Sequence, residues 1–385
     1  MKTPGCSARV EALNRHEMGH MRICFIVERF LGHVNYFDRL RSHIDNQVEF
    51  SPEYLYMENL RFPLRLVSNA AIPLLKDFDL DLHAARWQIT YSYSARRRLQ
   101  GILSKNRFDG LYFHTQNVAL LSSGIAEAYP VVLSMDATNT LLSNMGYSGR
   151  LPFTKATWKP GIILERQILK RARRIIAWSE WVRKSLLTDY GVADERISVV
   201  PPFVPFPQEK INRVGNPIPR LLFVGRNFVP KGGYDLLRCF KETLRRKCEL
   251  HIVTTSKIPQ NEENVFVHTN ASRGEIEHLY ATSDIFVYPT RVEAFGQVIA
   301  EAMSFGLPVV TTRVAAIPEM VHHGRNGFLT NPGNVDELGE YVNRLVDDPA
   351  MRKRMGAESE KLAHERFDFA INAQRICDIL REECS

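Results

Sequence analysis

Residues 284–303 read Asp284-Ile-Phe-Val-Tyr-Pro-Thr-Arg-Val-Glu-Ala-Phe-Gly-Gln-Val-Ile-Ala-Glu-Ala-Met303, an apolar run, a loop and a second apolar run. The first run is typical of a buried strand, and the second predicts a short helix. Glu293 lies in the loop, whereas Glu301 lies inside the apolar helix. An ionised carboxylate in such a helix costs several kcal/mol unless another group pairs with it. We therefore expect Glu301 to have a partner.

The start of this predicted helix is suited to an anion. The amides of Gly296, Gln297 and Val298 have no carbonyl within the helix to bind, so they would attract negative charge. Two carboxylates beside a positive helix end suit a ligand that carries both hydroxyls and phosphate. A nucleotide-sugar is such a ligand.

Strand and helix patterns alternate along the whole chain, which predicts an α/β protein with parallel sheets covered by helices on both faces. The expected strands are residues 21–27, 110–113, 131–134, 174–178, 197–200, 220–225, 249–254, 264–267, 284–288 and 307–311.

A proline-rich linker, Pro201-Pro-Phe-Val-Pro-Phe-Pro207, interrupts this alternation. The 385 residues, 44% of them hydrophobic, are enough for two domains with separate cores. We expect an N-terminal domain over residues 21–205 and a C-terminal domain over residues 206–365. Two doubly wound domains of this kind would bind a ligand in a cleft between them.

A glycine turn follows the strand predicted at residues 220–225. It reads Gly225-Arg226-Asn-Phe-Val-Pro-Lys231-Gly232-Gly233 and lacks the order of a Walker loop. Arg226 can bind a diphosphate through two hydrogen bonds, and Lys231 as a point charge. Surface turns also carry such cations without binding a ligand. The prediction of phosphate binding therefore depends mainly on the paired glutamates in the same domain.

Together these motifs resemble the family-4 retaining glycosyltransferases, which have the GT-B fold of two Rossmann-like domains. The resemblance is close in the C-terminal half, where it rests on the following segments: Val224-Gly-Arg, Lys231-Gly, residues 284–303, Gly306-Leu-Pro-Val-Val, Pro318-Glu-Met-Val and Gly324-Arg-Asn-Gly-Phe-Leu. It continues weakly through Ser179-Glu-Trp-Val and Val199-Val-Pro-Pro.

The resemblance implies roles for the C-terminal motifs. Glu293 would contact the donor sugar and Glu301 the ribose, while Arg226 and Lys231 would hold the diphosphate. Backbone amides from Phe295 to Val298, including Gly296 and Gln297, would bind sugar hydroxyls or phosphate. The family also implies that residues 366–385 form a helix that crosses back to the N-terminal domain.

Two positions depart from the family pattern, and both bear on the identity of the sugar. Ala294 stands where the family often has Gly, and Ala315-Ala316 replace a common Gly pair.

The N-terminal domain offers weaker candidates, because its glycine-rich loop is reduced to Leu31-Gly32-His33-Val34. Gly32 would let backbone approach the donor phosphate. Asp136 and His114 each follow a predicted strand. Capping or a buried hydrogen bond explains such residues equally well. Because His33 and Asp136 would share one rim of the cleft, we place them with Glu293 as catalytic candidates.

Residues 77–81 contain Asp77, Asp79 and Asp81, which form a D-x-D pattern that in another glycosyltransferase fold binds a metal. A metal requires several converging oxygen ligands, and no strand leads into this run. With Arg226 and Lys231 available to neutralise the diphosphate, we expect no metal and no cofactor. UDP or GDP is the expected nucleotide.

Basic residues are concentrated in the N-terminal half. Residues 1–205 hold 27 Lys and Arg against 19 Asp and Glu, whereas residues 206–385 hold 23 against 24. Two stretches, residues 61–76 and 165–187, mix cations with apolar residues. Such segments can lie on an anionic membrane, or they can be core elements with a solvated basic face. Nucleic acid is not favoured, because no recognition motif accompanies the charge.

The remaining features indicate a cytoplasmic enzyme. The six cysteines lack a disulfide spacing, and no run reaches the ~20 apolar residues of a membrane span. Residues 1–20 are polar and unpatterned and are expected to be a disordered lead.

We therefore expect a metal-independent, retaining hexosyltransferase that moves a sugar from a nucleotide-diphosphate sugar to an acceptor hydroxyl. The acceptor would be a lipid or saccharide at the cytoplasmic membrane face, or a soluble small molecule. A non-catalytic nucleotide-sugar-binding module, a phosphorylase and a nucleotide-sugar epimerase are the alternatives.

Overall fold

The chain forms two compact units, one of residues 1–200 with 370–385 and the other of residues 201–369. The sequence placed the corresponding boundaries at residues 205 and 365. The computed structural model describes residues 20–29, 33–58, 60–70, 75, 82–146, 153–208, 216–258 and 262–385, without the side chains of residues 33–35.

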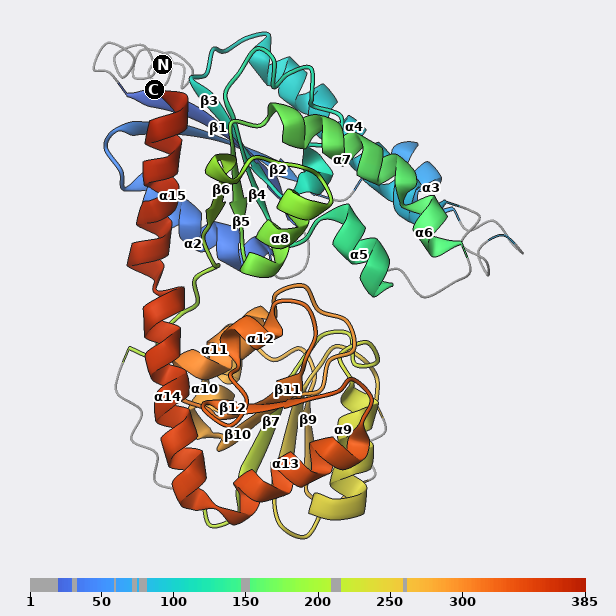
Figure 1. Cartoon of the computed structure of the whole chain (residues 1–385), viewed down its shortest axis with the longest axis vertical. Helices are drawn as coiled ribbons and strands as arrows, with labels where there is room; N and C mark the ends of the chain where they lie inside the picture. Colours follow the sequence, from blue (N-terminus) through green and yellow to red (C-terminus); the bar gives the residue numbers. More distant parts are fainter. Residues whose placement is uncertain are drawn as a thin grey trace, which may run out of the picture. The chain divides into compact units, whose positions relative to one another are not determined.

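The first unit is built on a six-stranded parallel sheet with the order β2-β1-β3-β4-β5-β6 (Figure 1). Its strands are β1 (Met21–Glu28), β2 (Phe50–Met57), β3 (Gly110–His114), β4 (Val131–Met135), β5 (Arg174–Ala177) and β6 (Ile197–Val199). Its helices are α2 (His33–Asp45), α3 (Leu64–Asn69), α4 (His83–Leu103), α5 (Asn139–Met145), α6 (Thr154–Thr157), α7 (Lys159–Arg171), α8 (Glu180–Thr188) and α15 (Phe369–Cys384), with short 3-10 turns η2 (Gln116–Val118) and η3 (Asp194–Arg196).

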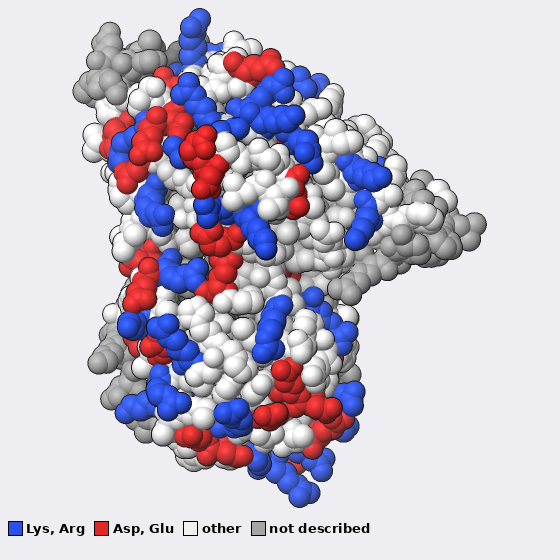
Figure 2. All heavy atoms as spheres, viewed as in Figure 1, with Lys and Arg blue, Asp and Glu red and all other residues white. Residues whose placement is uncertain are grey.

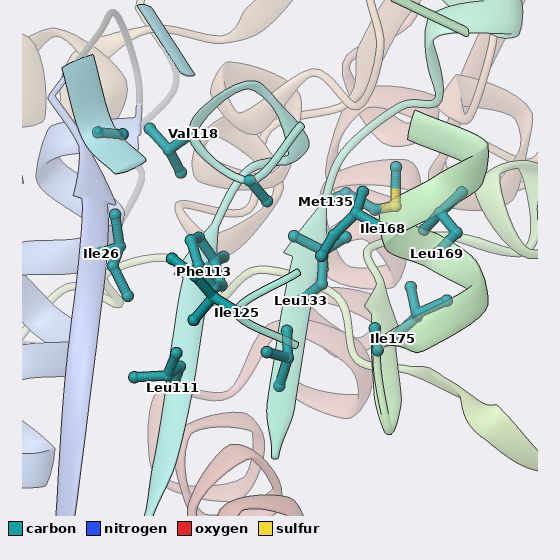
Figure 3. Packing of buried hydrophobic residues seen from close by; sticks show 14 of the residues in the cluster. Ile26, Leu111, Phe113, Val118, Ile125, Leu133, Met135, Ile168, Leu169 and Ile175 are labelled. Atoms are coloured by element: carbon teal, nitrogen blue, oxygen red, sulfur yellow. The ribbon is translucent and has the colours of Figure 1, made fainter. Parts of the chain in front are cut away.

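The core of the first unit follows from the period of its strands, because successive residues of a strand point to opposite faces. Figure 3 shows Ile26, Phe113 and Leu133 from three neighbouring strands in one core cluster, with Ile168 and Leu169 of α7 on the side of Leu133. All five side chains are fully buried. Because these strands are buried on both faces, packing from both sides holds the strand ends in fixed positions.

The second unit repeats this plan with the parallel order β12-β11-β10-β7-β8-β9. Its strands are β7 (Arg220–Val224), β8 (Glu249–Val253), β9 (Val265–His268), β10 (Ile285–Tyr288), β11 (Val309–Thr312) and β12 (Gly327–Thr330). Its helices are α9 (Gly233–Cys239), which continues into the π-helical η4 (Phe240–Leu244), α10 (Arg273–Thr282), α11 (Gln297–Ser304), α12 (Ile317–Met320), α13 (Val335–Asp347) and α14 (Pro349–Phe367). The two six-stranded parallel sheets confirm the predicted α/β class.

Two strands that the sequence analysis did not predict, β2 and β12, are both edge strands of their sheets. Pro52 lies within β2 and pairs with Ile23 of β1. Proline cannot donate a ladder hydrogen bond and is tolerated at an edge, so it obscures the strand signal without preventing the strand.

The last helix, α15, belongs to the first unit. Arg375 donates to the carbonyl of Val199 at 3.0 Å, and Glu383 pairs with Arg174 at 2.6 Å. Gly110 has no room for a side chain, because a Cβ there would lie 2.1 Å from Sγ of Cys384. Close packing therefore fixes the end of α15 against β3.

Within the part of the chain that the structure describes, no helix combines the length and the apolar character needed to cross a bilayer. The described cysteines are free and buried, and burial raises the pKa of the Cys24 thiol to about 12.

Candidate functional site

Glu293 lies in the loop between β10 and α11, and three donors hold its carboxylate. Oε2 accepts from Nζ of Lys231 at 3.0 Å and from the hydroxyl of Tyr288 at 2.9 Å. Oε1 accepts from the amide of Ala294 at 3.1 Å. Burial and the Glu293 charge together raise the pKa of Tyr288 well above its usual value, so its hydroxyl stays a donor. The sequence did not indicate Tyr288 as part of the site.

The loop after β7 and the loop that carries Glu293 are held together by backbone contacts. The carbonyl of Pro230 accepts from the amide of Arg291 at 2.9 Å, and Lys231 also donates to the carbonyl of Val292 at 2.8 Å. Gly232 has φ +73, and a Cβ there would lie 1.9 Å from the Pro289 carbonyl oxygen. The structure therefore brings Lys231 to Glu293, although the two are far apart in sequence.

Arg226 is positioned through its backbone. Its carbonyl oxygen accepts from three hydroxyls of the segment after β8, those of Thr254 at 3.0 Å, Thr255 at 3.2 Å and Ser256 at 3.0 Å. The Arg226 side chain is exposed, and no ion pair involving it occurs among the described residues. Its guanidinium is therefore available to an anion at the carboxyl ends of β7 and β8.

Glu301 has the partners that its apolar helix requires. Oε1 accepts from Nη1 of Arg273 at 2.8 Å, and Oε2 lies 3.3 Å from the donating hydroxyl of Tyr280. Arg273 also donates to Glu277 at 2.8 Å. Only 12% of the Glu301 side chain is exposed. Arg273 and Tyr280 were not predicted as partners, because the sequence carries no local signal for the packing of α10 beside α11.

The helix start next to these carboxylates has the expected geometry. Gly296 precedes α11 with φ +91, and its carbonyl accepts the amide of Ile299 at 2.9 Å. The amides of Gln297 and Val298 come before this first intrahelical bond and so have no carbonyl partner within the helix. Phe295 and Gly296 are buried, whereas Gln297 and Val298 are half-buried.

A neighbouring turn carries the alanines that replace the family's glycine pair. Ala315 has φ +48, in the left-handed region that favours glycine. The amide of Ala316 donates to the carbonyl of Ala294 at 3.3 Å, so this turn contacts the Glu293 loop.

The candidates of the first unit lie at the carboxyl ends of its central strands. Asp136 directly follows β4 and is half-buried. His114 ends β3 and is fully buried, with its ring 5.2 Å from that of Tyr36 and 5.9 Å from that of Trp178. His33 begins α2, but its side chain and Gly32 lie outside the described residues, so their proposed roles stay predictions.

Glu28 is a buried carboxylate at this same edge of the first sheet that the sequence analysis missed. It ends β1, where the Thr115 hydroxyl and, at 3.4 Å, Nδ2 of Asn117 donate to it. Thr115 has φ +81, a strained conformation for a β-branched residue, and such strain is common at functional sites. A single Glu after an apolar strand has no sequence pattern that would identify it.

Of the two basic stretches, residues 165–187 lie in α7, β5 and α8, and their contact with a membrane stays a prediction. Glu165 and Trp178 are buried, and Trp181 packs against the core. These side chains belong to the interior, and the exposed residues of the stretch are largely basic.

The D-x-D aspartates Asp77, Asp79 and Asp81 lie outside the described residues. Within the described residues no group of three His, Cys, Asp or Glu side chains could hold a metal ion. The expectation of a metal-independent reaction stays a prediction.

The arrangement in the second unit can bind an anion and hydroxyls at the carboxyl ends of its strands. Lys231, Arg226 and the α11 amides supply positive charge, whereas Glu293 and Glu301 each keep acceptor capacity beyond their present partners. This set of groups matches a ligand with a charged phosphate centre and a sugar on either side of it.

Two family models match the chain. The model described as glycosyltransferase family 4 covers residues 63–206, and that described as glycosyl transferases group 1 covers residues 208–362. Among curated proteins, the chain is 28% identical to the MMP alpha-(1->4)-mannosyltransferase of Mycolicibacterium hassiacum. That match spans 57% of this chain and 56% of the relative, so the chain spans little more than half of the relative's length.

Solved structures share the fold over nearly the whole chain. A sucrose-phosphate synthase from Thermosynechococcus elongatus matches with a TM-score of 0.71 at 15% identity, covering 94% of this chain and 99% of that one. HepE of Anabaena, solved in complex with UDP and glucose, matches with a TM-score of 0.63 at 19% identity, covering 94% and 100%. At these identities the likeness concerns the fold alone.

Proposed function

The chain belongs to the glycosyltransferases of family 4 and group 1, which have the GT-B fold, and from this premise we propose that it transfers a hexose from a nucleotide-diphosphate sugar to an acceptor hydroxyl. The observation that carries the proposal is the pair of carboxylates Glu293 and Glu301, each held by one cation and one tyrosine beside the start of α11.

In this proposal Glu301 accepts hydrogen bonds from the ribose, and Glu293 binds hydroxyls of the donor sugar. Arg226, Lys231 and the α11 amides stabilise the negative charge that grows on the diphosphate as it leaves, an electrostatic contribution of several kcal/mol. The complex of HepE with UDP and glucose supports UDP as the donor nucleotide.

We further propose that the transfer is retaining and independent of metal. The acceptor hydroxyl attacks the face that the diphosphate leaves, and the departing phosphate takes the acceptor proton. Two cations beside the site support the absence of a metal requirement. The enzyme would act in the cytoplasm, on a lipid or saccharide at the inner membrane face or on a soluble small molecule.

The test begins with a thermal-shift panel of UDP-, GDP- and ADP-sugars, followed by transfer assays with the stabilising donor. NMR of the product distinguishes retention from inversion, and EDTA tests the metal requirement. Calorimetry with the free nucleoside diphosphate then separates the glutamates. We expect Glu301→Ala to weaken binding about 10- to 100-fold, by loss of charged hydrogen bonds.

Glu293→Ala should mainly lower turnover, with nucleotide affinity largely kept. An equal loss of affinity in both variants would refute this division of roles. Activity abolished by EDTA and restored by Mg²⁺ would refute the metal-independent reaction.

A further inference from the structure

Helix α3 of the first unit carries its apolar residues on the outside. Leu66 and Val67 are 61% and 49% exposed, and Phe62, just before the helix, is 79% exposed, whereas the buried residue of α3 is Ser68. An isolated surface helix normally buries its apolar side chains and exposes its serines. This inversion leaves an apolar face without a partner in the described part of the chain.

The position of α3 is set by contacts with α4 rather than by this apolar face. Arg86 of α4 donates from Nη1 to the carbonyl of Val67 at 2.7 Å and from Nη2 to that of Ala70. These bonds satisfy carbonyls at the C-terminal end of α3. The helix is thus held on α4 by its backbone, and its apolar side chains remain outside.

Basic residues surround this face. Arg61 and Arg65 are exposed beside Phe62 and Leu66, and no acidic partner for either is found among the described residues. Counted on the sequence, residues 60–103 hold seven Lys and Arg against three Asp. The balance stays positive even with the three aspartates of residues 77–81 included.

The same chemistry extends over the helical layer to which α3 belongs. Helix α4 packs against α3, α6 and α7. The acidic residue of these four helices is Glu165, which is fully buried. Over the part where Figure 1 draws α4, α6 and α7, Figure 2 shows Lys and Arg side chains separated by uncharged surface, with a few Asp and Glu side chains beside them. The exposed basic residues of the layer are Arg65, Arg97, Arg98, Lys155, Lys159, Arg166, Lys170 and Arg171.

We propose that Arg61, Phe62, Arg65, Leu66 and Val67, called the α3 patch below, dock the protein on a bilayer that contains anionic phospholipid. Apolar side chains at this spacing enter the boundary between headgroups and acyl chains, and neighbouring arginines bind lipid phosphate. A solvated basic face would not need three exposed apolar side chains. A membrane explains both features together. This inference rests on the proposed function only in bringing the enzyme to a membrane-borne acceptor.

The test is co-sedimentation of the full chain with phosphatidylcholine vesicles, with and without phosphatidylglycerol, at low and high salt. The wild type should bind the anionic vesicles at low salt and be released at high salt. Arg61→Gln with Arg65→Gln should lower the partition coefficient about 30-fold at low salt, from roughly a fivefold effect per cation. Phe62→Ser with Leu66→Ser should lower it by on the order of tenfold.

The matched controls are Arg246→Gln and Ile218→Ser, which remove an exposed cation and an exposed apolar side chain from the second unit. Both controls should bind vesicles like the wild type. Soluble glycerophosphoglycerol at matched phosphate concentration should not compete, because it offers no apolar phase. Effective competition would mean that the patch binds a free phosphate compound, which overturns the proposal.

Failure of the wild type to sediment at low salt overturns it as well, as does wild-type behaviour of the patch variants. Nucleotide binding and thermal unfolding of every variant show that it is folded. Sugar transfer is measured separately on the same samples. A wild type that transfers sugar but does not bind vesicles rejects the docking surface alone, whereas a wild type that binds vesicles but transfers no sugar rejects the proposed function alone.

Discussion

The carboxylates of the two units are held in different ways. In the second unit, Glu293 and Glu301 each pair with a cation, Lys231 and Arg273, and each keeps part of its surface exposed. In the first unit, neutral donors hold the buried carboxylate of Glu165. It accepts from the backbone amide of Asn139 at 2.9 Å and from the Tyr190 hydroxyl.

This difference separates the proposed ligand site from a structural anchor. A carboxylate with a cation beside it stays ionised and can exchange partners with an incoming diphosphate or hydroxyl. A carboxylate buried among neutral donors fixes local geometry, as Glu165 does at the start of α5. The two sheets are each six-stranded and parallel, and the cations beside Glu293 and Glu301 distinguish the unit for which donor binding is proposed.

The largest effect that would test this comparison is expected for Lys231→Ala. Lys231 pairs with Glu293 and, in the proposed function, stabilises the departing diphosphate together with Arg226. We expect turnover to fall roughly 100- to 1000-fold, the usual loss on removal of one preorganised electrostatic group. The measurement is the single-turnover transfer rate. Lys241→Ala removes an exposed lysine that pairs with Glu262 and should leave the rate unchanged. A loss below about tenfold for Lys231→Ala would place the charge stabilisation elsewhere.

A smaller effect is expected for Arg273→Ala, which leaves Glu301 with Tyr280 alone. Because Arg273 acts through Glu301, we expect affinity for the nucleoside diphosphate to fall about tenfold, as for a lost charged hydrogen bond. Calorimetry measures this loss. In the Glu301→Ala background the same substitution should have little further effect, as coupled residues are not additive.

Glu277→Ala is the matched control for Arg273, because it removes the other carboxylate partner and keeps the bond to Glu301. Its nucleotide affinity should stay close to that of the wild type. Additive losses for Arg273→Ala and Glu301→Ala would show that Arg273 binds the nucleotide independently of Glu301.

The sequence predicted elements with strong local patterns and failed where tertiary packing decides. It predicted β10, α11 and the need of Glu301 for a partner, because an apolar run interrupted by one Glu is visible locally. It could not identify that partner, since Arg273 reaches Glu301 only when α10 packs beside α11. Glu28 escaped notice for the same reason. Its donors, Thr115 and Asn117, follow a different strand.

The pH dependence of stability tests whether Glu165 of the first unit is held as a buried carboxyl among neutral donors. Burial raises the pKa of its carboxyl to about 8 in the folded protein, against an ordinary value of 4.5. Between these values the folded state keeps a proton that the unfolded state has lost. Stability should therefore fall as the pH rises from about 4.5 to 8, and then stay level. Thermal unfolding across this range measures the effect.

Glu165→Gln should abolish this contribution, because an amide stays neutral throughout the range. From pH 5 to pH 8 the Tm of the wild type should fall by several degrees relative to the Tm of Glu165→Gln. Glu180→Gln alters an exposed ion pair and should follow the wild-type profile. A wild-type profile parallel to that of Glu165→Gln would mean that burial does not raise the pKa of Glu165.

The smallest expected effect concerns the turn beside the Glu293 loop. Ala315 adopts φ +48, a conformation that costs an L-residue roughly 1–2 kcal/mol. Ala315→Gly removes this strain but adds entropy to the unfolded chain, so the net gain should be about 0.5–1 kcal/mol, or roughly 1–4 °C in the Tm of the second unit. Ala316 is the matched control, because its φ of −79 lies in the ordinary helical region. Ala316→Gly should therefore destabilise the unit. If both substitutions lower the Tm, the left-handed conformation of Ala315 does not strain the turn that contacts the Glu293 loop.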